Sequence, residues 1–217
     1  MTEEQIKHQI EYLRSQKENP TGFYRQYLVN LYHLFYNGAK KNGTDWCPNV
    51  GIYTMVKAAY EYVGPVYMRF GRLAVPVIND RPDYKFEMGK GIVLREGKDV
   101  TIVANGLCVA ASLEAAEKLA AEGISAEVIN IHTIKPLDED MIVAAAKETG
   151  KVVTVEEHSV IGGLGGAVCE CLSEKAPVPV KRIGVNDVFG ESGPATALLE
   201  KYGLDAEGIY KQVKEFV

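Results

Sequence analysis

The stretch from Lys151 to Ala176, KVVTVEEHSVIGGLGGAVCECLSEKA, sets the architecture of this chain. Residues 152–155 are β-branched and short enough for a buried parallel strand. Three polar residues, at 156–158, follow at the predicted end of that strand, and a glycine-rich turn over 162–166 comes next. Apolar residues then recur at helical spacing up to Ala176. The order strand, polar residues, glycine turn and helix is typical of an open α/β sheet, whose ligands bind at this edge.

The flanking sequence repeats the alternation of short strands and helices. Strands are predicted at 91–94, 100–104, 126–131 and 178–183, and helices at about 109–120, 138–150, 194–202 and 205–216. Asp138 and Asp205 suit the N-cap positions of two of these helices. Such alternation favours βαβ units, so we expect a three-layer αβα sandwich with a mostly parallel sheet, α/β in class.

Residues 1–53 read differently, as a helical hairpin followed by a loop. The second helix carries a dense set of aromatic residues between Phe23 and Tyr36, which favours packing over an aromatic ligand pocket. A short helix near 56–63 and a strand at 66–70 come next. A proline-containing linker places the predicted domain boundary near residues 76–86.

Composition narrows the classes of partner. The chain has 217 residues and a net charge of −5 without a dense basic stripe, which argues against nucleic acid. No apolar run approaches the roughly 18 residues of a membrane span, and the N-terminus does not resemble a signal peptide. The four cysteines lack the spacing of a metal site, so we expect reduced thiols in a cytoplasmic protein.

The glycine turn has two interpretations. Gly163 and Gly165 do not belong to a dinucleotide fingerprint, because Val168 stands where the third glycine is required. Gly162, Gly163 and Gly165 would let a helix N-terminus meet an anion, or let the helix pack closely on a neighbouring domain. We favour the packing interpretation.

The polar residues beside the turn also have two interpretations. Glu156, Glu157 and His158 could perform acid–base chemistry, since a carboxylate can tune a histidine near pH 7. A capping and interface cluster is the favoured alternative. Arg69 lies at the end of the strand predicted at 66–70 and Arg72 lies just after it; both would suit a phosphate, although surface arginines are common.

Five motifs carry a family resemblance. They are GPVYMRFGR at 64–72, KGIVLREGKDVTIVANG at 90–106, INIHTIKPLDE at 129–139, VVTVEEHSVIGGLGGAV at 152–168 and GVNDVFGESGP at 184–194. On these motifs residues 53–217 resemble the C-terminal portion of transketolase, in the form found as a separate subunit. The resemblance implies two-carbon ketol transfer between sugar phosphates, as in the pentose phosphate pathway. It also implies thiamine diphosphate and Mg²⁺ in the complete, dimeric enzyme, where the cofactor serves as an electron sink.

The chain departs from the family pattern before residue 54. Residues 1–53 do not resemble the family, 54–84 are expected to be a remnant of the pyrimidine-binding domain with a linker, and 85–217 the C-terminal domain. No catalytic, cofactor-binding or metal-binding residue is therefore expected, and no cofactor for the chain alone. Arg69 alone matches a family site residue, the arginine that grips the substrate phosphate.

Two functional hypotheses follow. In the first, the chain joins an N-terminal transketolase subunit that carries the missing modules, and it is inactive alone. In the second, it is a non-catalytic assembly or ligand-binding module, where Glu157, His158, Gly162, Gly163 and Gly165 form an interface or anion site. A homodimer or larger assembly is expected in either case.

Overall fold

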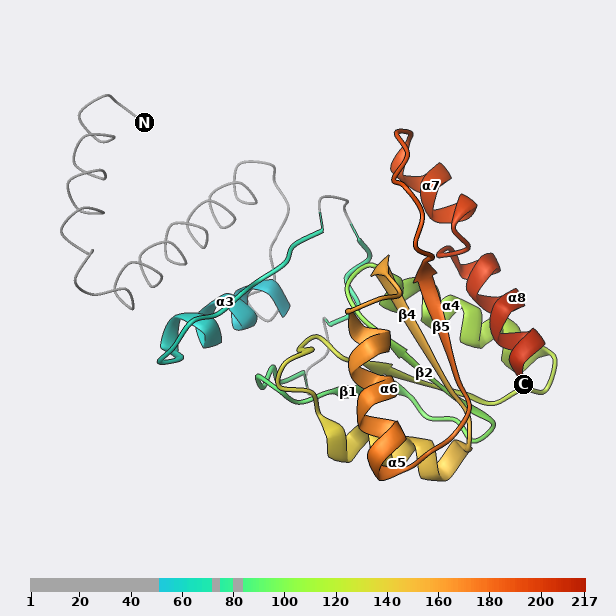
Figure 1. Cartoon of the computed structure of the whole chain (residues 1–217), viewed down its shortest axis with the longest axis horizontal. Coiled ribbons are helices and arrows are strands. Elements are labelled where there is room, and N and C mark those ends of the chain that lie inside the picture. The colour runs from blue at the N-terminus through green and yellow to red at the C-terminus, as the bar shows by residue number, and fades with distance from the viewer. Residues whose placement is uncertain (1–50, 72–74, 80–83) are drawn as a thin grey trace. The chain divides into compact units, whose positions relative to one another are not determined.

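The computed structural model describes residues 51–71, 75–79 and 84–217 (Figure 1). The predicted helical hairpin, its aromatic helix, Cys47 and Arg72 lie outside these residues. The chain divides into two compact units. The first contains the described parts of 1–69 and 77–88, and the second those of 70–76 and 89–217.

The first unit contains the helix α3 (Gly51–Glu61), which starts about five residues before the predicted position near Val56. The apolar spacing marked Val56 and Ala59, and both are buried in α3. The strand predicted at 66–70 is wrong, because residues 65–71 adopt no strand. A strand requires a hydrogen-bonded neighbour, and no described residue provides one here.

A single five-stranded sheet forms the centre of the second unit. Its strands are β1 (Ile92–Arg95), β2 (Val100–Ala104), β3 (Ala126–Asn130), β4 (Val152–Ser159) and β5 (Val180–Val185). The order across the sheet is β1-β3-β2-β4-β5. The last four strands are mutually parallel, and β1 pairs antiparallel with β3 at one edge. The predicted mostly parallel sheet is therefore confirmed.

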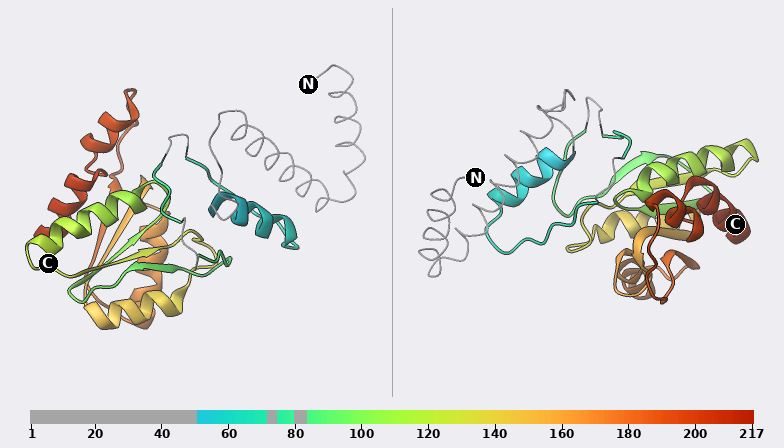
Figure 2. Two further views of the ribbon diagram at one scale, coloured as in Figure 1. Left: turned by 180° about the vertical axis from the view of Figure 1, so that it is seen from behind. Right: turned by 90° about the horizontal axis from the view of Figure 1, so that it is seen from above.

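Helices cover both faces of this sheet (Figure 2). They are α4 (Cys108–Ala121), α5 (Glu139–Thr149), α6 (Leu164–Lys175), α7 (Ala195–Lys201) and α8 (Ala206–Phe216). α5 and α6 pack together on one face, and α4 and α8 pack together on the other. All residues of β2 and β3 are buried as a result, which confirms the αβα sandwich. No helix among the described residues has the length and apolar character needed to cross a membrane.

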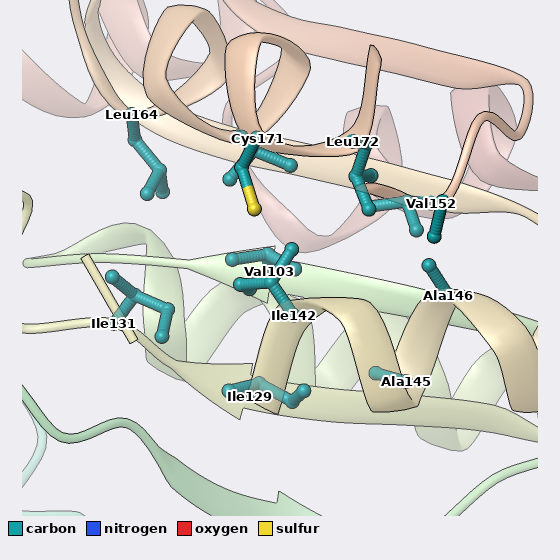
Figure 3. Packing of buried hydrophobic residues seen from close by; sticks show 12 residues of the cluster. Val103, Ile129, Ile131, Ile142, Ala145, Ala146, Val152, Leu164, Cys171 and Leu172 are labelled. Atoms are coloured by element: carbon teal, nitrogen blue, oxygen red, sulfur yellow. The ribbon is translucent and has the colours of Figure 1, made fainter. Parts of the chain in front are cut away.

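Figure 3 shows the core between the sheet and the α5–α6 layer. Val103 and Ile129 of the sheet are fully buried there, opposite Ile142 of α5 and Leu172 of α6. Burying side chains of this size stabilises the fold by about 1.5–3 kcal/mol each before entropy is subtracted. The core therefore holds the strands in place, including β4, whose carboxyl end carries the candidate site described below.

Asp138 links two distant elements at the start of α5. Its Oδ1 accepts a long hydrogen bond of 3.5 Å from the amide of Met141, as predicted for an N-cap. Its Oδ2 accepts a hydrogen bond of 3.0 Å from the amide of Gly91, just before β1. Lys90 lies 3.5 Å from Oδ1, and the Asp138 side chain is only 6% exposed. One buried carboxylate thus accepts hydrogen bonds both from the first turn of α5 and from the segment just before β1.

Three predicted boundaries are corrected. β4 continues past Val155 to Ser159, because Ser159 at its end still pairs with Val185 of β5. The polar residues expected after the strand therefore lie within it. β5 begins at Val180, two residues later than predicted. Pro194 is the N-cap of α7 and precedes its first turn. Asp205 caps α8 as predicted, accepting from the amide of Gly208 at 3.0 Å.

Candidate functional site

Glu156 is the centre of the cluster at the end of β4. It is 1% exposed, whereas its neighbour Glu157 is exposed. Its Oε2 accepts a hydrogen bond from the amide of Leu164, and its Oε1 accepts one from the amide of Gly165, both at 2.7 Å. These amides belong to the first turn of α6, whose donors have no partner within the helix. The carboxylate also lies at the positive end of the helix dipole, so Glu156 is a capping residue.

The glycines of the turn allow this close approach. A Cβ atom on Gly163 would lie 2.0 Å from Oε2 of Glu156 and 2.9 Å from Nδ1 of His158. Gly162 has a φ of 74°, in the left-handed region that favours glycine. A Cβ atom on Gly165 would lie 2.8 Å from Oγ1 of Thr154. Close packing within this unit therefore accounts for Gly163 and Gly165, while packing on a neighbouring domain stays a prediction.

His158 lies beside the cap and remains accessible. Its Nδ1 is 3.9 Å from Oε2 of Glu156, and the side chain is 44% exposed. The same nitrogen lies 2.8 Å from the backbone carbonyl oxygen of Ser159, to which it donates in the neutral tautomer that carries the proton on Nδ1. Nε2 is then the acceptor. Glu156 already accepts from two amides, so the geometry favours the capping interpretation over acid–base chemistry, while an interface at these residues stays a prediction.

Contacts with β5 position the backbone that follows His158. Arg182 of β5 donates through Nη1 to the carbonyl oxygen of Val160 at 2.7 Å. A Cβ atom on Gly184 would lie 2.8 Å from the carbonyl oxygen of His158. Ile161 follows with its amide bonded to the hydroxyl of Ser159 at 3.2 Å. Two hydrogen bonds therefore hold this segment, and Gly184 allows β5 to approach it closely.

Cys108 is a neighbour of this cluster that the sequence did not identify. It begins α4 and is fully buried. Burial, followed by the negative charges of Glu157 and Glu156, raises the pKa of the thiol to about 12. Such a thiol stays protonated near neutral pH and is a poor nucleophile. The sequence gave no sign of the carboxylate neighbours of Cys108.

His132 does not join His158 in a metal site. It follows β3, which is separated from β4 by β2. Its Nδ1 lies 2.9 Å from Oγ1 of Thr133, and burial lowers the pKa of the imidazole. Among the residues that the structure describes, no group of three His, Cys, Asp or Glu side chains is placed to hold a metal ion.

The described residues also do not fit a diphosphate–metal site. The amides of Leu164 and Gly165, the natural donors to a phosphate at the start of α6, are already bonded to Glu156. A phosphate there would meet a buried carboxylate. The anion interpretation of the turn therefore has no support in this arrangement.

The structure assigns the candidate site residues to different units. Arg69 is exposed, lies in the first unit and is part of an irregular segment. Glu157, His158 and the three glycines, Gly162, Gly163 and Gly165, all lie in the second unit, at the end of β4 and the start of α6. Within the second unit the structure therefore brings the predicted cluster together.

Exposed apolar side chains occupy the carboxyl edge of the sheet. They follow β3, β4 and β5 in turn, and we call them the carboxyl-edge surface: Ile134, Ile161, Val188 and Phe189, with exposed fractions of 37%, 58%, 58% and 98%. The loop that carries Phe189 projects beyond the sheet before α7 (Figure 1). Sequence reasoning missed this surface, because its members are single apolar residues spread over three loops.

A doubly covered, mostly parallel sheet with an antiparallel edge strand and a carboxylate-capped glycine turn defines the class of this domain as α/β. Residues 89–209 match the family model of the transketolase C-terminal domain, "Transketolase, C-terminal domain". The chain belongs to this family.

Its relatives include separate subunits. It is 52% identical over 152 residues to the 6-deoxy-6-sulfo-D-fructose transketolase subunit SqwH of Clostridium sp. (strain MSTE9), covering 70% of this chain and 47% of that protein. It is 47% identical over 163 residues to a putative transketolase C-terminal section of Methanocaldococcus jannaschii, covering 74% of this chain and 51% of that protein. The chain thus spans about half the length of these curated relatives.

A solved structure shares the fold. It is described as a split gene transketolase, inactive beta4 tetramer, and it is 56% identical with a TM-score of 0.72. The match covers 76% of this chain and 54% of that one. The similarity confirms the transketolase C-terminal fold expected from the five sequence motifs.

Proposed function

We propose that this chain is the C-terminal part of a split transketolase, which transfers a two-carbon ketol unit between sugar phosphates together with a separate N-terminal subunit. The carrying observation is the family match over 89–209, together with relatives that are themselves named as a subunit or a C-terminal section. The chain would contribute a supporting domain and would be inactive alone. A cytoplasmic location is part of this proposal, and it agrees with the three described cysteines, Cys108, Cys169 and Cys171, which form no disulfide in the structure.

Thiamine diphosphate and Mg²⁺ would be held elsewhere in the complete enzyme. The described residues of this chain provide no metal-binding group, and the amides at the start of α6 are occupied by Glu156. Arg69 would bind the phosphate group of the sugar, because it is exposed and a guanidinium forms paired hydrogen bonds with phosphate.

Reconstitution tests this function. The chain would be mixed with an N-terminal transketolase subunit, thiamine diphosphate and Mg²⁺, and two-carbon transfer from a ketose phosphate to an aldose phosphate would be followed by mass spectrometry. We expect activity only in the mixture. No turnover at any subunit ratio would refute the proposal.

Arg69 gives the test a sharper form. Arg69→Ala should raise the KM for phosphorylated substrates about tenfold or more, as expected for the loss of one charge-assisted contact, and leave non-phosphorylated analogues unaffected. Lys57→Ala is the matched control, because Lys57 is another exposed cation of the first unit. Equal effects of the two variants on phosphorylated substrates would remove Arg69 from the site.

A second function is favoured by one observation, the carboxyl-edge surface. We propose that the chain alone is a non-catalytic assembly module that forms a homodimer or a larger oligomer. A 56% identical chain is described as an inactive tetramer, which supports this proposal. Sedimentation velocity at several concentrations tests it, and a monomer throughout would contradict it.

A further inference from the structure

Glu127 is a buried carboxylate that the candidate site does not use. It lies on β3, is 6% exposed, and its Oε2 lies 2.7 Å from Oγ1 of Thr101 on β2. Oγ1 of Thr149, in the last turn of α5, lies 2.9 Å from the same hydroxyl. We call these three side chains the Glu127 network. The network connects two strands of the sheet to a helix through side chains alone.

The Glu127 network ends on the backbone between α5 and β4. Oγ1 of Thr149 donates to the carbonyl oxygen of Ala145 at 3.0 Å or to that of Lys151 at 3.1 Å. Oγ1 of Thr101 makes a longer contact of 3.5 Å with the Ala145 carbonyl oxygen, and the amide of Thr101 donates to the Lys151 carbonyl oxygen at 2.9 Å. Residues 145–151, which we call the α5–β4 junction, are thus linked to β2 through both hydroxyls.

The protonation state of Glu127 sets the direction of these hydrogen bonds. A hydroxyl has one proton to donate, and an ionised carboxylate only accepts. When Glu127 is ionised, the proton of Thr101 points to the carboxylate, so the proton of Thr149 is shared between Oγ1 of Thr101 and the two carbonyl oxygens. When Glu127 is protonated, it donates to Thr101, Thr101 donates to Thr149, and Thr149 donates to the junction. Hydrogen bonds aligned in this way strengthen one another.

The surroundings of Glu127 favour the protonated form. Burial is the main cause that raises the pKa of this carboxyl group; the hydrogen bond from Thr101 lowers the pKa, and the negative charges of Glu96 and Glu148 raise it further. Glu96 lies in the loop between β1 and β2, and Glu148 lies in α5. A Cβ atom on Gly97 would lie 2.0 Å from the amide nitrogen of Glu127, so that loop packs closely on β3. Among the residues that the structure describes, no cation forms an ion pair with Glu127.

We propose that the Glu127 network is a proton-sensitive contact, in which a proton bound at Glu127 directs the hydroxyls of Thr101 and Thr149 toward the α5–β4 junction and holds the last turn of α5 in place. Loss of that proton turns the hydroxyl of Thr101 back to the carboxylate and loosens the junction. Because the pKa of Glu127 is raised in the fold, the stabilisation is complete below the usual pKa of a glutamate and is lost as the pH rises through the raised value. The inference goes beyond the proposed functions, since the network lies at the amino end of the strands, opposite to the candidate site.

Hydrogen–deuterium exchange of the full chain tests this inference. Mass spectrometry would give the protection factor of the peptide covering residues 145–152 from pH 4.5 to 7.5, with the intrinsic exchange rate divided out. We expect protection to fall by up to about tenfold per pH unit above the usual pKa of a glutamate, because opening of the junction then releases one proton. Glu127→Gln keeps a neutral donor and acceptor at this position, so its junction should stay protected without that slope.

Two further variants separate the hydroxyl contact from general stability. Thr149→Val should remove the slope from this peptide, while the carboxyl group of Glu127 still titrates in carbon-13 nuclear magnetic resonance. Glu117→Gln, which changes an exposed glutamate on α4, is the matched control and should behave as the wild type. Circular dichroism establishes that each variant is folded. If Thr149→Val does not fold, Thr149→Ser takes its place, and it should keep the slope because it keeps the hydroxyl.

The comparison of the wild type with Glu127→Gln decides the inference. An equal slope in both chains, or wild-type protection that does not change with pH, would overturn it. A slope retained in Thr149→Val, or lost in Thr149→Ser, would also overturn it, because the hydroxyl of Thr149 would then not carry the effect. None of these measurements involves ketol transfer or self-association, so their outcome is independent of both proposed functions.

Discussion

Replacing Glu156 with alanine should destabilise the second unit through the start of α6. The substitution removes two hydrogen bonds of 2.7 Å and leaves the buried amides of Leu164 and Gly165 without acceptors. A hydrogen bond to a charged group contributes about 1.5–3 kcal/mol net, and loss of an N-cap costs about 0.5–2 kcal/mol. Relief from burying a carboxylate offsets part of this loss. We expect a net decrease of about 3 kcal/mol in the free energy of unfolding.

Urea denaturation followed by far-ultraviolet circular dichroism measures this change. With a slope of about 2 kcal/mol per molar urea, the midpoint should fall by about 1.5 M. Glu156→Gln should lose roughly half as much, since its amide oxygen can still accept from one donor. Glu157→Ala is the matched control, because that side chain is adjacent and exposed. If Glu156→Ala and Glu157→Ala shift the midpoint equally, the capping role assigned to Glu156 is refuted.

Three further expectations concern stability and reactivity. Gly163→Ala should cost at least about 2 kcal/mol, because its Cβ would lie 2.0 Å from the carboxylate of Glu156, whereas Gly166→Ala, with open space at its Cβ, should be neutral or stabilising in urea denaturation. Burial raises the pKa of Glu127, so the contribution of this side chain to stability is present at low pH and is lost as the pH rises through the raised pKa. Glu127→Gln should remove this pH dependence. Urea midpoints of the wild type and the variant that change in parallel from pH 4.5 to 7.5 would contradict this expectation. The thiol of Cys108, with a pKa of about 12, should resist a disulfide reagent at pH 8 until urea unfolds the chain, and prompt labelling detected by mass spectrometry would exclude this environment.

Periodicity in the sequence predicted the second unit well. The strand 100–104, the strand 126–131 to within one residue, and the caps Asp138 and Asp205 agree with the structure, because their signals are local: β-branched runs and short polar caps. The strand at 66–70 failed for a non-local reason. Its residues have the right propensity, but strand formation depends on a neighbour that propensity does not reveal.

The candidate site could be predicted only in outline. The sequence brought the polar residues and the glycine turn together, since they are close in the chain. It did not indicate which carboxylate points inward, because the strand was expected to end before Glu156. It also missed Cys108 near Glu156 and Glu157, and the carboxyl-edge surface that includes Phe189. Both depend on the strand order, which joins segments that are distant in the chain.

The shared carboxylate of Asp138 has a consequence for local opening. Because it accepts from the amides of both Gly91 and Met141, fraying of the chain before β1 and fraying of the first turn of α5 are energetically linked. Amide protons at these two positions, 50 residues apart in the chain, should exchange with deuterium at rates that change together when Asp138 is replaced by alanine. A substitution that destabilises the segment before β1 would then also destabilise the first turn of α5.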